Sequence, residues 1–292
     1  MQKSQALHSA DIPWRCTAWQ LRTRSLEFGD LPALMGIVNV TPDSFSDGGK
    51  YFTPSQAVDH ALRLEDAGAS ILDVGGESTR PYSDPVAAEE EWRRIEPVLG
   101  SLVGRVSIPI SIDTSKSSIA RRATEMGVEI INDVTGLEGD PEMLAVAAQS
   151  AAGVCAMHMQ GTPQSMQDDP HYENVVHEIY DYLQQRDHAL QAAGIDANRI
   201  CLDPGIGFGK SHAHNLELLR GCQKFLELRR PILIGHSRKG FISKILGAPS
   251  TDRTLGSLGV SLALAAKQIP LLRVHDVAGT QQALACFAAC GL

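Results

Sequence analysis

Residues 108–133 read IPISIDTSKSSIARRATEMGVEIIND, and this stretch indicates the fold of the whole chain. A short apolar run at 108–112 ends at Asp113, and a segment of helical periodicity follows at 116–126. A second apolar run at 128–131 comes next, and it too ends in polar residues. The stretch therefore predicts a strand, a helix, and a second strand that runs parallel to the first.

The same pattern continues outward in both directions. Apolar runs predict eight strands, at 34–38, 70–74, 108–112, 128–131, 153–157, 199–202, 231–234 and 271–274. The segments between and after them predict helices near 55–67, 87–99, 116–126, 141–150, 173–193, 213–228, 251–267 and 278–289. Adjacent apolar residues such as Ile130 and Ile131 suit strands that are covered on both faces. The repeat indicates an α/β protein with a closed (β/α)8, or TIM, barrel.

We expect one domain with an N-terminal extension. Residues 33–292 would form the barrel, and residues 1–32 would form a short hairpin or plug over its floor. Trp14, Trp19 and Phe28 supply the apolar side chains that such a plug needs. An open, doubly wound sheet is the alternative fold, because a strand pattern does not by itself establish closure.

Composition excludes several classes of protein. The net charge is −8, and no basic face is visible, so we expect no nucleic-acid partner. No apolar run is long enough to cross a membrane, and the first 15 residues lack the pattern of a signal peptide. The six cysteines contain no C-x-x-C pair, which suits free thiols in a reducing compartment. We therefore expect a cytoplasmic protein.

Polar residues follow nearly every predicted strand, and in a barrel these ends would meet at one rim. They include Asn39, Asp113, Asn132, His158, Asp203, Lys239 and His275. The carboxylates of Asp113 and Asp203 and the amide of Asn132 would accept hydrogen bonds from a donor-rich ring such as an aminopyrimidine. Lys239 and Arg273 would bind carbonyl or phosphate oxygens. Structural carboxylates bonded to backbone N–H groups are the alternative for both aspartates.

The loop at 39–49 is long and rich in Ser, Asp and Gly. We interpret it as a mobile lid over the rim that brings the ring of Phe45 to a substrate. Asn39 and Asp47 offer hard oxygen ligands, which suit Mg2+ held together with substrate phosphates. The alternative is a solvated loop with Phe45 packed into the core.

One apparent phosphate-binding motif does not hold. Residues 205–211 read GIGFGKS, but the nucleotide-binding loop requires a glycine where Pro204 stands. An ATPase is therefore rejected on this motif.

Taken together, these segments resemble a known family. Residues 35–49 closely resemble the first signature of dihydropteroate synthases, and residues 75–81 resemble their second loop. Further segments follow in the order of that family, at 111–114, 131–133, 157–161, 202–210, 237–239 and 273–277. The resemblance implies a barrel enzyme that joins a dihydropterin pyrophosphate to p-aminobenzoate and releases pyrophosphate.

It also implies roles for individual residues. The pterin would bind Asp113, Asn132, Asp203 and Lys239, with Met157 near its ring. Arg273 and His275 would bind the departing pyrophosphate beside a Mg2+ ion at Asn39, and Asp47 would organise the metal. The p-aminobenzoate pocket, which sulfonamides would share, would be shaped by Phe45, Thr79, Arg80, Pro81, Phe208 and Ser237. Asp113, Lys239, Arg273 and Asp47 would be catalytic, and the late helices would form a homodimer.

Departures and alternatives bear on that implication. Tyr82 stands where many members have a small residue, so it could crowd the p-aminobenzoate entrance, and His236 replaces Met, Val or Thr. A folate-dependent methyltransferase domain would share the pterin acids but would not need the loops at 39–49 and 78–81. A pterin-binding paralogue without turnover is the other alternative.

Overall fold

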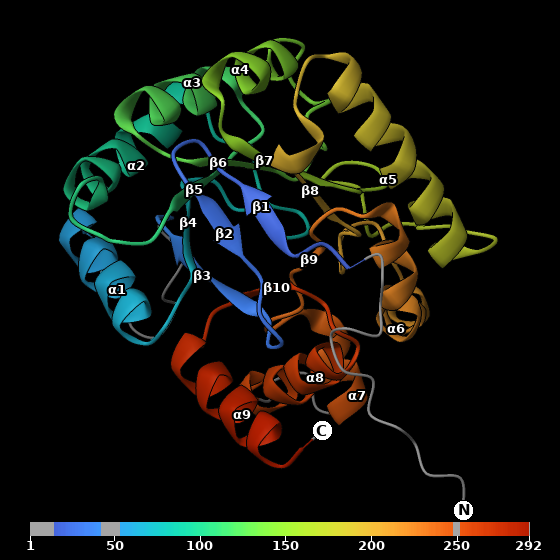
Figure 1. The fold of residues 1–292 in the computed structure, drawn as a ribbon. Coiled ribbons are helices and arrows are strands. Elements are labelled where there is room, and N and C mark those ends of the chain that lie inside the picture. The colour runs from blue at the N-terminus through green and yellow to red at the C-terminus, as the bar shows by residue number, and fades with distance from the viewer. Residues whose placement is uncertain (1–14, 42–52, 248–251, 292) are drawn as a thin grey trace, which may run out of the picture.

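The computed structural model describes residues 15–41, 53–247 and 252–291 of the 292 in the chain. Parallel strands form a ring at its centre (Figure 1). They are β3 (Ala33–Asn39), β4 (Ile71–Gly75), β5 (Ile110–Asp113), β6 (Ile130–Asp133), β7 (Gly153–Met157), β8 (Ile200–Asp203), β9 (Leu233–Ile234) and β10 (Leu271–Val274).

The order of the strands is β8-β7-β6-β5-β4-β3-β10-β9, so β8 and β9 are the two ends of the sheet. A parallel bridge between Leu202 and Ile232 joins these ends, and the Leu202 N–H donates to the carbonyl of Pro231 at 2.9 Å. The sheet is thereby closed into the expected barrel, and the open-sheet alternative is wrong.

Helices surround the strands. They are α1 (Pro54–Asp66), α2 (Ala88–Leu102), α3 (Ser117–Met126), α4 (Met143–Ser150), α5 (Val175–Ala192), α6 (His212–Gly221), α7 (Gly240–Leu246), α8 (Thr254–Ala266) and α9 (Val277–Ala289), with 3-10 segments η2 (Ala197–Arg199) and η3 (Cys222–Leu228). Each predicted helix is present, although the one expected at 213–228 is α6 followed by η3. The short α7 was not predicted. None of the helices in the described ranges has the length and hydropathy needed to cross a membrane.

Local sequence explains where several helices begin. Thr53 and Gln56 form a reciprocal capping box at the start of α1, and Pro54 fits its first turn. Ser211 and His214 cap α6 in the same way. The Asp276 side chain accepts from the Gly279 N–H and caps α9.

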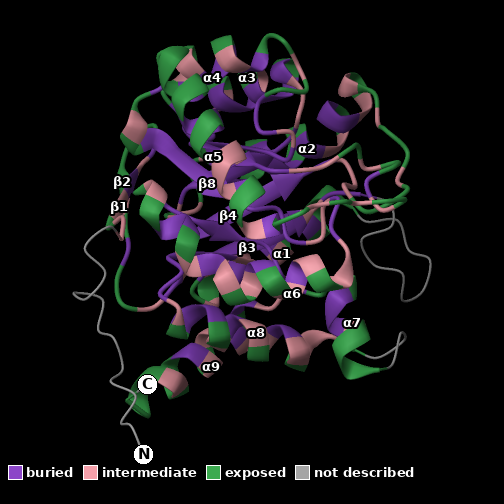
Figure 2. Ribbon diagram, turned by 90° about the vertical axis from the view of Figure 1, so that its right-hand side faces the viewer, coloured by how far each residue is buried: buried purple, intermediate pink, exposed green. Residues whose placement is uncertain are grey.

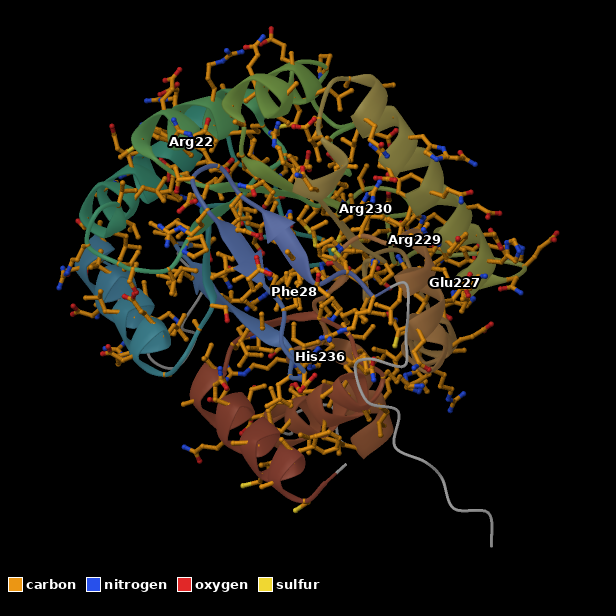
Figure 3. The ribbon with its side chains drawn as sticks, in the orientation of Figure 1. Arg22, Phe28, Glu227, Arg229, Arg230 and His236 are labelled. Atoms are coloured by element: carbon orange, nitrogen blue, oxygen red, sulfur yellow. The ribbon has the colours of Figure 1, made fainter. Side chains whose placement is uncertain are left out.

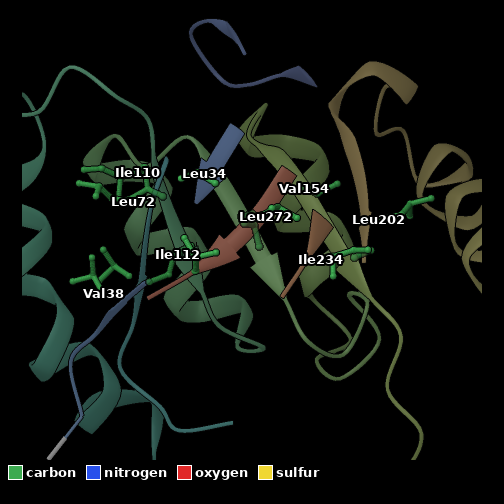
Figure 4. Packing of buried hydrophobic residues seen from close by; sticks show 14 of the residues in the cluster. Leu34, Val38, Leu72, Ile110, Ile112, Val154, Leu202, Ile234 and Leu272 are labelled. Atoms are coloured by element: carbon green, nitrogen blue, oxygen red, sulfur yellow. The ribbon is translucent and has the colours of Figure 1, made fainter. Parts of the chain in front are cut away.

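The main core lies between the strands and the helices, where the helices turn their buried faces inward (Figure 2). Alternate strand residues point outward into this layer (Figure 4). They include Leu34, Val38, Leu72, Ile110, Ile112, Val154, Leu202, Ile234 and Leu272. The remaining strand positions face the barrel axis.

The amino-terminal hairpin closes one end of the barrel. It consists of antiparallel strands β1 (Ala18–Gln20) and β2 (Ser25–Glu27), and Figures 1 and 3 show it across the end of the ring with Phe28 nearby. Its apolar side chains join inward-facing residues in one cluster, called here the floor cluster. The members are Trp19, Leu21, Phe28, Met35, Ile71, Ile130, Cys155, Cys201, Leu233 and Leu271. The expected hairpin is confirmed; Trp14 lies outside the described residues.

Candidate active site at the carboxyl ends of the strands

Inward-facing residues change from apolar to polar along several of the strands. Ile71 belongs to the floor cluster, and Asp73 stands two positions later in β4. Arg273 follows Leu271 in β10 at the same spacing. Residues two apart in a strand share a face, so a polar layer lies above the apolar floor. Residues at this spacing from the floor cluster include Asp73, Asn132, Met157, Asp203 and Arg273.

Arg273 connects two acids across the barrel. Its Nε donates to Asp73 Oδ2 at 2.6 Å, and its Nη2 donates to Asp113 Oδ2 at 2.8 Å. Asp73 is fully buried, and the side-chain amide of Asn132 also lies against its carboxylate. Three successive strands, β4 to β6, and the distant β10 thus place polar side chains in one network.

Burial raises the pKa of Asp113 to about 7, although the guanidinium of Arg273 opposes the shift. Asp73, a second acid at the same guanidinium, adds to the increase. For Arg273, burial alone would lower the pKa, but the carboxylates of Asp73 and Asp113 outweigh it and raise the pKa. The site therefore holds a permanent cation beside an acid that titrates near neutral pH.

Lys239 provides a second cation, which follows β9, the strand next to β10 and its Arg273. Its Nζ donates to the carbonyl of Ile206 and lies 4.4 Å from the centre of the Phe208 ring. Burial lowers the pKa of Lys239 to about 8, against the opposing effect of Asp203. Burial also raises the pKa of Asp203, whose Oδ1 accepts from the Gly205 N–H at 2.7 Å.

These groups lie at or beneath a cleft of about 360 Å3. Its lining includes nine residues that the sequence predicted for the site, Asn39, Thr79, Arg80, Pro81, Asp113, Phe208, Lys239, Arg273 and His275. Four other predicted residues are buried and do not line the cleft, namely Asn132, Met157, Asp203 and Ser237. Phe45 and Asp47 lie outside the described residues.

His275 and Ser237 form a pair at the edge of the cleft. The Ser237 Oγ accepts from the His275 backbone N–H at 3.2 Å and lies 3.0 Å from His275 Nδ1. Burial lowers the pKa of His275 to about 3, and the neighbouring Arg273 contributes to the decrease. The imidazole is therefore neutral, and a serine proton donated to Nδ1 would leave Nε2–H as a donor toward the cleft.

Buried ion pairs hold the loop after β4. Lys116 bridges Glu77 and the fully buried Glu91, at 2.6 Å from Glu91 Oε2. Glu77 Oε1 also accepts from the Val86 N–H at 2.8 Å. The Thr79–Pro81 segment of the cleft wall is thus attached to the barrel through these acids.

Tyr82 extends this wall at the mouth of the cleft, where 65% of its surface is exposed. Its hydroxyl donates to Asp168 Oδ1 at 3.1 Å, and its backbone N–H donates to the carbonyl of Pro163 at 2.9 Å. The loop after β4 is thereby joined to the loop after β7. The backbone of Tyr82 has φ near 63°, a left-handed conformation that is strained for a side chain of this size.

The sequence missed some residues of the site. Asp73 was missed because it lies inside a strand, whereas active-site residues of a barrel are expected at strand ends. The only signal was a charged residue within the apolar run at 70–74. Glu77 and Met166 also line the cleft. Glu77 stands after the second predicted strand, within the segment 75–81, but was given no role, and nothing in the sequence separates Met166 from other loop residues.

The donor set for a metal is sparse. Asn39 ends β3 and brings an amide oxygen to the cleft wall. In the part of the chain that the structure describes, no three His, Cys, Asp or Glu residues are grouped to hold an ion. The amide of Asn39 is a donor of the kind that fits Mg2+, which keeps several waters and binds through one or two protein oxygens together with substrate phosphates.

Comparison with known proteins agrees with this architecture. The family model described as pterin binding enzyme matches residues 35–275. A dihydropteroate synthase from Neisseria meningitidis serogroup C is 46% identical over 267 residues, covering 90% of this chain and 94% of that protein. The dihydropteroate synthase of Escherichia coli K12 is 43% identical over 253 residues, covering 87% and 89%.

Solved structures agree as well. The Yersinia pestis dihydropteroate synthase, in a sulfonamide drug complex, superposes with a TM-score of 0.88 at 39% identity, covering 94% of this chain and 99% of that one. The Xanthomonas albilineans enzyme in complex with 7,8-dihydropteroate gives a TM-score of 0.82 at 41% identity, covering 94% and 98%. The barrel and its polar mouth are thus those of a pterin-binding enzyme. Within this class the chain belongs to the dihydropteroate synthases, which are transferases of folate biosynthesis.

Proposed function

We propose that this chain condenses 6-hydroxymethyl-7,8-dihydropterin pyrophosphate with p-aminobenzoate to give 7,8-dihydropteroate and pyrophosphate. The observation that carries the proposal is the polar layer itself, in which acids, an amide and two cations from different strands converge beside one cleft. A flat heterocycle with donors on one edge and an anionic tail matches this arrangement.

The pterin would lie on the acids at the base of the cleft. Asp113 and Asp203 would accept from its amino and ring N–H groups, and Lys239 would donate to its carbonyl oxygen. Met157, which is buried below, would support the ring. We assign Asp113 a catalytic role because its negative charge would stabilise the cationic ring that forms as the leaving group departs.

Arg273 and His275 would bind the pyrophosphate. The bond between the methylene carbon and the pyrophosphate oxygen breaks, so negative charge develops on the leaving oxygen. Arg273 would neutralise that charge, and the neutral His275 would contribute an N–H donor. The nitrogen lone pair of p-aminobenzoate then forms the new carbon–nitrogen bond, and the amine loses a proton.

Mg2+ would be held by Asn39, by Asp47 and by the substrate phosphates. When bound, the ion would supply positive charge to the leaving pyrophosphate. The residues of the chain would do the remaining work of orienting both substrates. Removing Mg2+ with a chelator should abolish turnover, and Mg2+ should restore it; turnover that survives complete removal would contradict this assignment.

The second substrate would occupy the outer part of the cleft. Thr79, Arg80 and Pro81 form one wall there, and Phe208 lies across from them beside Lys239. Ser237 would support this pocket through its contact with His275. Phe45 would also contribute to it, as the family resemblance implies. Since an arylamine is a weak nucleophile, its positioning would supply much of the rate.

One measurement tests the function directly. The full chain, supplied with Mg2+ and dihydropterin pyrophosphate, should release pyrophosphate only when p-aminobenzoate is present. Release that does not depend on p-aminobenzoate would contradict the second substrate. Pterin binding without any release would instead favour the non-catalytic paralogue, and transfer of a methyl group would favour the methyltransferase.

We also propose that the chain acts as a homodimer in the cytoplasm. An apolar groove of about 300 Å3 lies between α6, α7 and α8, and Ile245 and Leu246 on its rim are about half exposed. A second copy of the chain would cover these side chains. Sedimentation should give a dimer for the native chain and a monomer for Ile245→Glu; a monomeric native chain would contradict the proposal.

A further inference from the structure

Lys210 is a buried lysine that the proposed function does not use. Only 2% of its surface is exposed. Its Nζ lies 2.8 Å from the carbonyl of Phe208, 3.3 Å from the carbonyl of His158 and 3.0 Å from His158 Nδ1. All three partners are uncharged acceptors, so the lysine is buried without a carboxylate among its hydrogen-bond partners. Burial lowers the pKa of Lys210 well below its usual value, against the opposing effect of the Asp203 carboxylate. A buried amino group held by three hydrogen bonds calls for a structural or functional explanation.

The three acceptors match an ammonium group, which has three N–H donors. His158 can accept at Nδ1 because burial and the nearby Lys210 lower the pKa of its imidazole to about 3. The edge of its ring packs against Tyr182 with the ring centres 4.7 Å apart, which fixes the imidazole plane. The hydrogen bonds therefore have a defined geometry.

These contacts join two strand ends. His158 follows β7, and its N–H donates to the carbonyl of Asp203 at the end of β8 at 2.9 Å. Phe208 lies in the loop after β8, and Lys210 connects that loop back to His158. Gly205 lies so close to His158 that a Cβ on it would be 1.9 Å from the His158 carbonyl oxygen. The loop at 204–209 is thus held against the end of β7.

The same loop carries three parts of the proposed pterin site. Its Gly205 N–H binds the Asp203 carboxylate, and its Ile206 carbonyl accepts from Lys239. Its Phe208 ring packs against the Lys239 ammonium. A displacement of this loop would therefore move an acid, a cation and an aromatic wall together.

We propose that Lys210 is a positioning residue that holds the loop at 204–209 in the geometry that binds the pterin through Asp203 and Lys239. This inference rests on the proposed function, because it takes Asp203 and Lys239 as pterin ligands. It adds a residue that touches neither substrate and acts through the Phe208 and His158 carbonyls.

The test compares two variants with a matched control. Lys210→Met removes all the N–H donors, while Lys210→Gln keeps two N–H donors for the two carbonyls. Arg199→Met is the control, because Arg199 is a buried cation that also donates to backbone carbonyls, those of Ala147 and Ala152, at the opposite end of β8. Steady-state rates and the melting temperature are measured for each, and pterin affinity is measured by calorimetry.

For Lys210→Met we expect the KM and Kd for the dihydropterin pyrophosphate to rise about tenfold, the change expected if the displaced loop weakens one charge-assisted hydrogen bond between the pterin and Asp203 or Lys239. The kcat at saturation should stay within about threefold of the native value, since the reacting groups remain. Lys210→Gln should recover part of the affinity. Arg199→Met should lower the melting temperature and leave the KM unchanged.

Three outcomes would overturn the inference. The first is a folded Lys210→Met variant with the native KM. The second is a KM that rises equally in Arg199→Met. The third is a Lys210→Gln variant that fails to fold, because the lysine would then serve the fold rather than the site. An inactive native chain would instead contradict the proposed function, so the two failures are distinguishable.

Discussion

Asn132 donates its side-chain amide to the carboxylate of Asp73, with Nδ2 lying 3.3 Å from Oδ2. This contact turns the Asn132 carbonyl oxygen away from Asp73 and leaves it as an acceptor. Asp73 also accepts from Arg273 Nε at 2.6 Å, so one fully buried acid orients an acceptor and a cation at once. Asp73 lies below the cleft, and we infer that it acts by positioning these two side chains.

Replacing Asp73 with Asn should therefore impair both halves of the site. The guanidinium of Arg273 loses one of its two anionic partners, and the amide of Asn132 loses the group that sets its direction. We expect kcat/KM for the pterin substrate to fall about 100-fold, as for the loss of a preorganised electrostatic contact. Asp187→Asn is the matched control, because it breaks the ion pair between Asp187 on α5 and Arg230 before β9, neither of which lines the cleft. Equal losses in the two variants would show that Asp73 serves stability alone.

The pH dependence of kcat/KM for the pterin substrate should be bell-shaped, because that parameter reports ionisations of the free enzyme. Burial raises the pKa of Asp113 to about 7, so its negative charge is lost as the pH falls below that value. Burial lowers the pKa of Lys239 to about 8, so its positive charge is lost as the pH rises above that value. The maximum should therefore lie between about pH 7 and 8.

Lys239→Arg supplies the control for this profile. A guanidinium stays charged throughout the range, so the alkaline limb should disappear in that variant while the acid limb remains. A native profile that is flat between pH 6 and 9 would contradict both assignments. Persistence of the alkaline limb in Lys239→Arg would assign that limb to another group.

The sequence predicted the barrel well because its signals are local and repeated. Each strand is a short apolar run, and β7 and β10 begin and end where they were expected. The short α7 was missed because seven residues leave little room for helical periodicity, and it directly follows the Ser237–Lys239 motif. Closure through Leu202 and Ile232 is a contact between distant segments, which no local pattern specifies.

The site could be predicted only in part, for the same reason. Asp113, Lys239 and Arg273 were found because they stand at or near strand ends, where the βα loops of a barrel build its active site. Asp73 required knowledge of which strand face points inward. Lys210 was recognised in a motif, but its partners His158 and Phe208 come from two different loops. The sequence identifies which residues stand at the ends of strands. The hydrogen bonds and ion pairs between those residues depend on how the strands and loops pack together.

The link between Tyr82 and Asp168 should affect the second substrate. It joins two loops at the mouth of the cleft, so its loss should loosen the outer wall without disturbing the buried acids. For Tyr82→Phe we expect the KM for p-aminobenzoate to change by about threefold, since an exposed hydrogen bond is worth under about 1 kcal/mol. A double-mutant cycle with Asp168→Ala, which removes the acceptor, measures the coupling. Additive effects of the two changes would show that the contact has no role in binding.

Gly205 should tolerate no side chain. Its φ of 69° lies in the left-handed region, and a Cβ there would be 1.9 Å from the carbonyl oxygen of His158. The loop after β8 would have to move away from the end of β7, which would break the Gly205 N–H contact with Asp203 and displace the carbonyl that binds Lys239. We expect Gly205→Ala to lower the free energy of unfolding by about 3 kcal/mol or more, because it combines backbone strain with a buried clash.

Gly29→Ala is the control. Gly29 has open space around it, so this substitution should change the free energy of unfolding by less than about 1 kcal/mol. Urea denaturation of both variants measures the difference, and a Gly205→Ala chain as stable as Gly29→Ala would mean that the loop does not approach His158 in the way described.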